Sequence, residues 1–89
     1  MSPVVTLYSK SYCPYCQQAK ALLKQKGVPF RDIEITDDPV LTAEMKERSG
    51  RHTVPQIFIG NFHVGGASDL FELEAAGGLD PLIRSSLAA

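Results

Sequence analysis

Two cysteines are the residues of this sequence best suited to do chemistry. Cys13 and Cys16 are the only cysteines among 89 residues, and they stand in the tetrapeptide Cys-Pro-Tyr-Cys. Such a pair is typical of redox chemistry when it follows a strand and opens a helix, because the helix start offers free N–H groups and a partial positive charge that favour a thiolate. We therefore expect Cys13 to be an exposed, acidic nucleophile. Cys16 lies one helical turn further on the same face, so we expect it to be the resolving thiol.

Three other roles for this pair stay open from the spacing alone. A zinc site would need two more ligands, but the sequence has no second C-x-x-C, and His52 and His63 stand eleven residues apart instead of the three to five of zinc fingers. Two inert core cysteines are the second alternative, although a helix-start pair that straddles a proline is a poor core pattern. The third is an iron–sulfur cluster held in a dimer by Cys13 and external thiolates. We expect no metal and no bound cofactor.

The elements that must position the cysteines follow from the apolar pattern. β-branched and aromatic residues over 4–8 predict a buried strand, which polar residues end. A helix is expected over residues 13–26, with Pro14 in its first turn and Gly27 as its stop. Alternating residues over 30–35 predict a second strand. A strand–helix–strand run of this kind is typical of a parallel crossover unit.

The middle of the chain predicts a second helix and a hairpin. Asp38 begins the helix and Gly50 ends it, with basic residues near its negative end. Residues 55–59 and 62–64 then predict two strands. The link between them is Gly60-Asn61, which is typical of an antiparallel hairpin.

The end of the chain predicts two more helices. Ser68 can cap a helix that runs to about residue 76, and Asp80 starts a last short helix. The whole order is βαβ, α, ββ, α, α. We therefore expect the α/β class and the thioredoxin-like fold, with a four-stranded mixed sheet flanked by helices.

Composition and charge exclude several classes of function. The chain is 44% hydrophobic and 21% charged, as in ordinary folded domains, and we expect one domain over residues 1–89. A net charge of -1 does not supply the basic field of a nucleic-acid-binding domain. No uncharged apolar run approaches the ~18 residues of a membrane span, and the first ten residues lack a signal-peptide pattern. We expect a cytoplasmic protein with no nucleic-acid and no membrane partner.

Three separated motifs resemble those of the dithiol glutaredoxins, a family of the thioredoxin-like superfamily. The Cys-Pro-Tyr-Cys pair is followed, at the family's spacing, by Thr53-Val54-Pro55 and by Gly-Gly-Ala-Ser-Asp, which ends at Asp69. The resemblance covers nearly the whole chain, up to Leu82. It implies that the protein is a glutaredoxin.

The resemblance implies a glutathione-binding loop beside Cys13. Thr53, Val54 and Pro55 would face the cysteines, with a cis peptide before Pro55 that leaves the Val54 backbone free to pair with the cysteinyl unit of glutathione. Pro55 would also block access of a metal. Tyr15 would pack beside the sulfur.

The two ends of glutathione would be bound by other residues that match the family's motifs. Gly66 would let the backbone approach closely, and the helix start at Ser68 and Asp69 would offer N–H groups to the γ-glutamyl carboxylate. The Asp69 carboxylate would take the ammonium group. Lys10 and Arg51 would address the glycyl carboxylate.

The function implied by the resemblance is that of a glutathione-dependent thiol–disulfide oxidoreductase. Cys13 alone would reduce glutathionylated proteins by a monothiol route, whereas protein disulfides would need Cys13 and Cys16 in a dithiol route. Glutathione is then a co-substrate and the protein acts in redox homeostasis and electron donation. The expected partners are glutathionylated or disulfide-bonded proteins, with ribonucleotide reductase as a candidate client, and we expect a monomer.

Two related functions stay as alternatives. Thioredoxins share the fold and spacing, but they carry Cys-Gly-Pro-Cys after a tryptophan, and this sequence has no tryptophan. A non-catalytic carrier would hold an iron–sulfur cluster between two protomers with two glutathiones. In the family that function is associated mainly with glycine or serine at the position of Pro14, because proline stiffens the turn.

Two positions depart from the family pattern. His52 stands before Thr53 where relatives often have arginine, so a titratable group replaces a fixed charge. Ala67 stands where many relatives have a third cysteine, which removes a route to regulatory oxidation.

Overall fold

The computed structural model describes residues 4–88, which form four strands and four helices. The elements in chain order are β1 (Val5–Ser9), α1 (Pro14–Gln25), β2 (Phe30–Glu34), α2 (Pro39–Ser49), β3 (Gln56–Ile59), β4 (Phe62–Gly65), α3 (Ala67–Ala75) and α4 (Leu79–Ala88). Their order and type confirm the predicted sequence of elements. The two ends of the expected domain, residues 1–3 and 89, lie outside the described residues.

The four strands form one mixed sheet in the order β2-β1-β3-β4. β1 pairs parallel with β2 and antiparallel with β3, and β3 pairs antiparallel with β4. The expected parallel crossover and hairpin are therefore both present. The central strands β1 and β3 are mostly apolar and almost wholly buried because both of their faces are covered, and their buried polar residues are Ser9 and Gln56.

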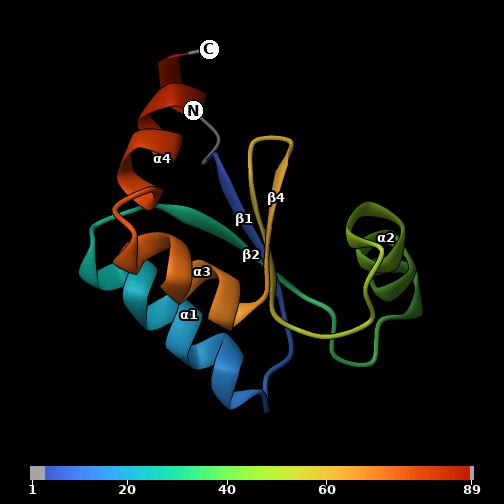
Figure 1. Ribbon diagram of the computed structural model, residues 1–89. Helices are drawn as coiled ribbons and strands as arrows, with labels where there is room; N and C mark the ends of the chain where they lie inside the picture. Colours follow the sequence, from blue (N-terminus) through green and yellow to red (C-terminus); the bar gives the residue numbers. More distant parts are fainter. Residues whose placement is uncertain (1–3, 89) are drawn as a thin grey trace.

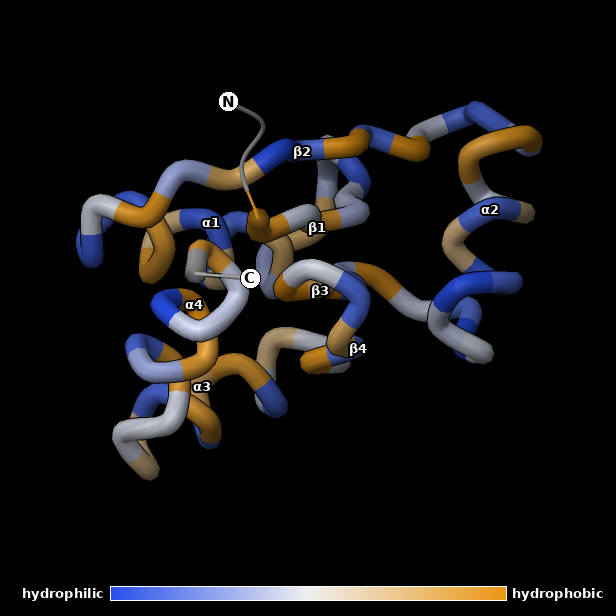
Figure 2. Tube along the Cα trace, turned by 90° about the horizontal axis from the view of Figure 1, so that it is seen from above, coloured by the Kyte–Doolittle hydropathy of each residue, from blue (hydrophilic) through white to orange (hydrophobic). Residues whose placement is uncertain are grey.

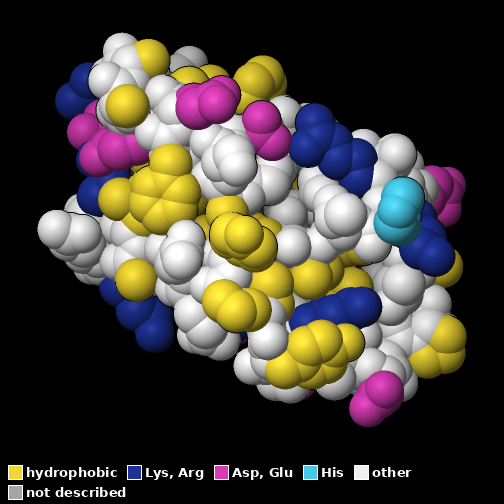
Figure 3. All heavy atoms as spheres, turned by 60° about the horizontal axis from the view of Figure 1, so that its bottom comes forward, with side chains coloured by type: hydrophobic (Ala, Val, Ile, Leu, Met, Phe, Trp, Pro, Cys, Tyr) yellow, Lys and Arg dark blue, Asp and Glu magenta, His cyan; other side chains and the backbone are white. Residues whose placement is uncertain are grey.

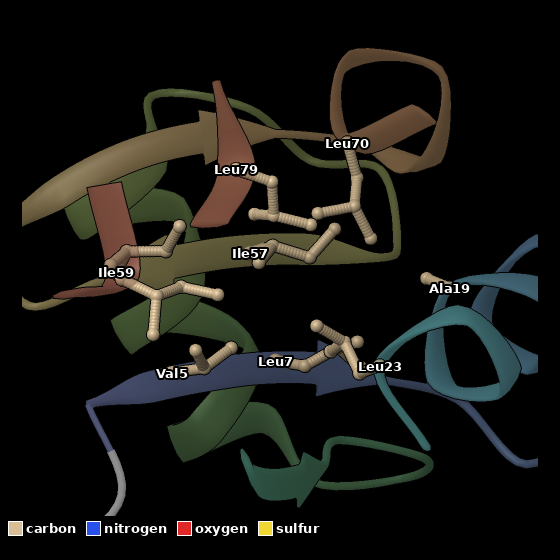
Figure 4. Close-up of a cluster of buried hydrophobic side chains, with 9 residues drawn as sticks. Val5, Leu7, Ala19, Leu23, Ile57, Ile59, Leu70 and Leu79 are labelled. Atoms are coloured by element: carbon tan, nitrogen blue, oxygen red, sulfur yellow. The ribbon is translucent and has the colours of Figure 1, made fainter. Parts of the chain in front are cut away.

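Helices cover the two faces of the sheet unequally. α1, α3 and α4 lie together on one face, whereas α2 stands alone on the other (Figures 1 and 2). The main core fills the space between the sheet and the three helices, and Figure 4 shows its buried side chains, Val5, Leu7, Ala19, Leu23, Ile57, Ile59, Leu70 and Leu79. A smaller cluster beneath α2 contains Tyr8, Ile35, Met45 and Phe58. No helix within residues 4–88 is long and apolar enough to cross a bilayer.

The first two helices begin and end as their sequences predict. Cys13 is the N-cap of α1, Pro14 occupies its first turn, and Gly27 follows with a positive φ of 70°. In α2, the Asp38 carboxylate caps the helix by accepting the N–H of Leu41 at 3.0 Å.

The predicted cap of α3 is wrong. The N-cap is Gly66, two residues before Ser68, and the carboxylate of Asp69 accepts the Gly66 N–H at 2.8 Å. An acidic side chain at the third helical position can reach back in this way and satisfy a backbone donor that a serine cap would not reach. Consequently Ser68 lies inside the first turn. The last helix begins at Leu79, one residue before Asp80.

The main core predicts the cost of removing a side chain from α1. Leu23 is 0% exposed against the sheet, whereas Leu87 in α4 is 61% exposed. Leu23→Ala should lower the free energy of unfolding by about 2–5 kcal/mol, because it removes buried apolar surface and leaves a cavity. The matched change Leu87→Ala should cost less than about 0.5 kcal/mol. Urea unfolding checks both, and equal losses would contradict this description of the core.

Candidate active site

Cys13 lies at the start of α1 with its sulfur directed back over the helix end. Its Sγ accepts the backbone N–H of Cys16 at 3.2 Å and lies 3.7 Å from the carbonyl oxygen of Val54. A helix N-terminus and a direct N–H donor both stabilise a thiolate. The expectation that Cys13 is exposed is wrong, because only 9% of its surface is accessible. The sulfur is partly covered where the helix start meets the loop that contains Val54.

Cys16 has a different environment one turn further along α1. Its side chain is completely buried. Burial, followed by the hydrogen bond with Cys13, raises the pKa of Cys16 to about 12, while the backbone of Lys10 and the charge of Lys20 act in the opposite direction. Cys16 is therefore a thiol at neutral pH. Its burial also keeps it from direct contact with a large disulfide substrate.

The loop before β3 faces the cysteine sulfur. The peptide bond between Val54 and Pro55 is cis, as the family resemblance implies. Thr53 is exposed, Val54 is half-buried and Pro55 is buried. The loop thus presents backbone next to Cys13 at the surface of the protein.

An open hollow of about 300 Å³ extends from this loop to the start of α3. The side chains and backbone that line it come from three separate segments of the chain: Tyr15, Arg51, Thr53, Val54, Pro55, Gly66, Ala67, Ser68 and Asp69. The structure therefore brings together all the predicted glutathione-binding residues except Lys10. Ala67 is an additional lining residue, which its place between Gly66 and Ser68 could have indicated.

Lys10 belongs to a different hollow. It lies with Tyr12, Asp38 and Lys46 around a space of about 520 Å³ beside the start of α2. Its contact with the redox pair is through the backbone, because its carbonyl accepts the Cys13 N–H at 3.2 Å. His52 is exposed in the loop that leads to Thr53.

Arg51 and Asp69 form an ion pair across the hollow. The Arg51 guanidinium lies 3.1 Å from Asp69 Oδ2, and both side chains are about half exposed. The Gly66 N–H and then Arg51 lower the pKa of Asp69 below its ordinary value. Asp69 is therefore a carboxylate at neutral pH, and it offers an acceptor to a cationic ligand group.

The backbone geometry requires a glycine at position 65 but not at position 66. Gly65 has a φ of 117°, and a Cβ there would overlap the Asp69 carboxylate. Gly66 has an ordinary φ of -90°, and a Cβ on it would stay 3.6 Å from the nearest atom, the carbonyl oxygen of Pro55. The close approach at Gly65 is what lets Asp69 reach the Gly66 N–H.

Apolar and basic side chains share the molecular face that carries the start of α1. Figure 3 shows hydrophobic side chains gathered there, with Lys and Arg side chains among and beside them. Tyr12, which precedes Cys13, is 71% exposed, and Tyr15, which lies between the two cysteines, is 63% exposed. No group of three His, Cys, Asp or Glu side chains within residues 4–88 could hold a metal ion.

The fold and the site together define a class of protein. A C-x-x-C pair at a helix start, opposite a cis-proline loop in a four-stranded mixed sheet, is the arrangement of a thiol–disulfide oxidoreductase with a thioredoxin-like fold. The sequence profile of the Glutaredoxin family matches residues 5–64. The chain belongs to the glutaredoxin family, whose members are glutathione-dependent disulfide oxidoreductases, and it is an enzyme of that class.

Individual relatives and solved structures agree with this assignment. Glutaredoxin 3 of Escherichia coli (strain K12) is 54% identical over 80 residues, which are 90% of this chain and 96% of the relative. The solution structure of glutaredoxin from Brucella melitensis is 55% identical, with a TM-score of 0.79 over 93% of this chain and 91% of that one. The buckwheat glutaredoxin–glutathione complex is 32% identical, with a TM-score of 0.85 over 94% and 79% of the two chains. The thioredoxin and inert-cysteine alternatives are therefore set aside.

The two cysteines should differ sharply in reactivity. Iodoacetamide at pH 8 should modify Cys13, whereas Cys16 should stay protected because it is buried and its pKa is raised to about 12. In the variant Cys13→Ser, Cys16 should react at least about tenfold more slowly than a free cysteine. Mass spectrometry of timed reactions measures both rates. Labelling of Cys16 as fast as Cys13 would show that this assignment of roles is wrong.

The lowered pKa of Asp69 gives a pH-dependent contribution to stability. Asp69→Asn should lower the free energy of unfolding at pH 7 by about 0.3–1 kcal/mol, because it weakens the contacts with Gly66 and Arg51. The advantage of the wild type should be present above the ordinary carboxyl pKa of 3.8 and disappear as the pH falls through the lowered value. Urea unfolding at a series of pH values from 7 down to 2 measures it, with exposed Glu47→Gln as a control.

Proposed function

We propose that this enzyme uses glutathione to reduce glutathionylated proteins through Cys13 alone and protein disulfides through Cys13 and Cys16 together. The observation that carries the proposal is the position of the Cys13 sulfur. The sulfur accepts a hydrogen bond from the Cys16 N–H and faces the carbonyl oxygen of Val54. Val54 lines the hollow that also contains the Asp69 carboxylate. A disulfide-linked glutathione fits this combination of an activated sulfur, a free backbone segment and an anionic end.

Glutathione would bind along the hollow in an extended form. Its cysteinyl unit would pair with the Val54 backbone, as an added strand does. The γ-glutamyl carboxylate would meet the N–H groups at the start of α3, and its ammonium group would meet Asp69. That contact would compete with Arg51, and a released Arg51 would be free to address the glycyl carboxylate.

The monothiol route needs two disulfide exchanges. The Cys13 thiolate attacks the glutathione sulfur of the mixed disulfide, so a bond forms between Cys13 and glutathione while the bond to the protein thiol breaks. The protein leaves as a thiolate and takes a proton from solvent. A second glutathione thiolate then attacks the bound glutathione sulfur, which releases glutathione disulfide and restores the Cys13 thiolate.

The dithiol route adds Cys16 as an internal attacker. Cys13 first forms a mixed disulfide with the protein substrate and releases one of its thiols. Cys16 then attacks the Cys13 sulfur, and its proton passes to the departing thiolate. Two glutathiones reduce the resulting internal disulfide. Since burial holds the pKa of Cys16 at about 12, this route starts from a thiol and should be the slower one at neutral pH.

The partners follow from this chemistry. They are glutathione and proteins that carry mixed or internal disulfides, and ribonucleotide reductase remains a candidate client. The buckwheat relative was solved with glutathione, which supports the same ligand here. We place the protein in the cytosol, because both cysteines must be kept reduced by a glutathione pool. We propose that it acts as a monomer.

Single-cysteine variants test the two routes. With glutathione, glutathione reductase and NADPH, the wild type should turn over a glutathionylated peptide, and Cys13→Ser should lose at least about 10³-fold, because no nucleophile remains. Cys16→Ser should keep most of this activity, because the monothiol route does not use Cys16. The same variant should lose reduction of a protein disulfide. NADPH consumption measures all four rates.

Two outcomes would count against the proposal. Loss of peptide activity in Cys16→Ser would mean that both routes need the pair. An inactive wild type would show that the protein is not a glutathione-dependent reductase of glutathionylated proteins. In that case a brown dimer on anaerobic purification would favour the iron–sulfur carrier, whereas a colourless monomer would exclude it.

A further inference from the structure

Gln56 connects the active-site loop to the interior of the protein. It follows Pro55 directly and is completely buried. Its Nε2 donates to both the carbonyl oxygen and the hydroxyl of Thr53, at 3.0 and 3.1 Å. Thr53 lies outside the helices and strands, so this side chain supplies hydrogen bonds that a regular ladder does not.

His63 completes the polar arrangement from the neighbouring strand β4. Its Nε2 lies 2.7 Å from Gln56 Oε1. Because the Thr53 carbonyl can only accept, the Gln56 amide nitrogen must face Thr53 and its oxygen must face His63. The His63 Nε2 must therefore carry a hydrogen and donate it. This assignment follows from the hydrogen-bond network.

The His63 ring is held in place by aromatic packing. It stacks on Phe58 with ring centroids 4.8 Å apart and an interplanar angle of 27°. The Arg48 guanidinium lies 4.2 Å from the Phe58 ring centroid, which ties this stack to α2. Burial, followed by the charge of Arg51, lowers the pKa of His63, and both favour the neutral ring. The donor is thus fixed in direction.

We propose that His63 and Gln56 are positioning residues that hold the loop of Thr53, Val54 and Pro55 in the shape that binds glutathione. Both act through the loop, and neither lines the hollow beside Cys13. The proposal rests on the proposed function and extends it, because it assigns part of glutathione affinity to a histidine behind the loop. Loss of the His63 donor would leave the Gln56 oxygen buried without a partner and loosen the hold on Thr53.

Three variants separate positioning from general stability. His63→Phe keeps an aromatic ring on Phe58 but removes the donor. His63→Gln restores an amide N–H near the position of Nε2. The matched control is Tyr8→Phe, which removes hydrogen bonds to Glu44 at 2.6 Å and from Arg48 at 2.9 Å in the apolar cluster that contains Phe58. The Tyr8 hydroxyl has no part in the hydrogen bonds that join Thr53, Gln56 and His63.

Steady-state kinetics with a glutathionylated peptide give the main readout. His63→Phe should raise KM about tenfold, the scale of a lost buried hydrogen bond, with kcat and the rate of Cys13 alkylation within about twofold of wild type. His63→Gln should recover most of the affinity, and Tyr8→Phe should leave KM unchanged. An unchanged KM in His63→Phe overturns the proposal, as does an equal rise in KM in Tyr8→Phe.

A second measurement does not depend on glutathione. Amide hydrogen exchange over residues 53–56 should be faster in His63→Phe than in the wild type, His63→Gln or Tyr8→Phe. If the wild type failed to turn over the peptide, the proposed function would fail while exchange would still decide the positioning. Exchange over this segment that is unchanged in His63→Phe would then overturn the inference.

Discussion

The antiparallel pairing of β1 with β3 is the contact on which the active site depends. Val5 pairs with Ile59 and Tyr8 pairs with Gln56, so the end of β1 lies beside the start of β3. The chain leaves β1 toward Cys13 and enters β3 through the cis-proline loop. Two segments that are far apart in the sequence therefore meet. The Cys13 sulfur lies 3.7 Å from the carbonyl oxygen of Val54, a residue 41 positions further along the chain. A change of register would separate them.

One short helix start gives two cysteines opposite properties. Cys13 is the N-cap of α1, where a backbone N–H meets its sulfur, whereas Cys16 lies one turn deeper against the core. Burial raises the pKa of the second sulfur, whereas the first lies at the helix end beside the Val54 carbonyl. The same three-residue spacing thus supplies the two environments that the proposed nucleophile and the proposed resolving thiol need.

The polar groups of the site are held by hydrogen bonds to residues beneath the loop as well as to residues at the surface. Gly65 has the backbone shape that lets Asp69 close on the Gly66 N–H, and Arg51 lies across from that carboxylate. On the other side of the loop, Gln56 satisfies both polar groups of Thr53 and is itself held by His63. These networks connect the surface hollow to β4 and α3, so the shape of the site depends on residues that do not line it.

The sequence by itself determined the order of elements, the helix start at Cys13, the cis-proline loop and most residues of the hollow, because local patterns and family motifs encode them. It did not determine the cap of α3, the small exposed fraction of Cys13, the separate hollow around Lys10 or the contact between His63 and Gln56. Each of these depends on how segments far apart in the chain approach one another. Spacing and propensity act within a few residues, whereas burial and hydrogen-bond partners are decided by long-range packing.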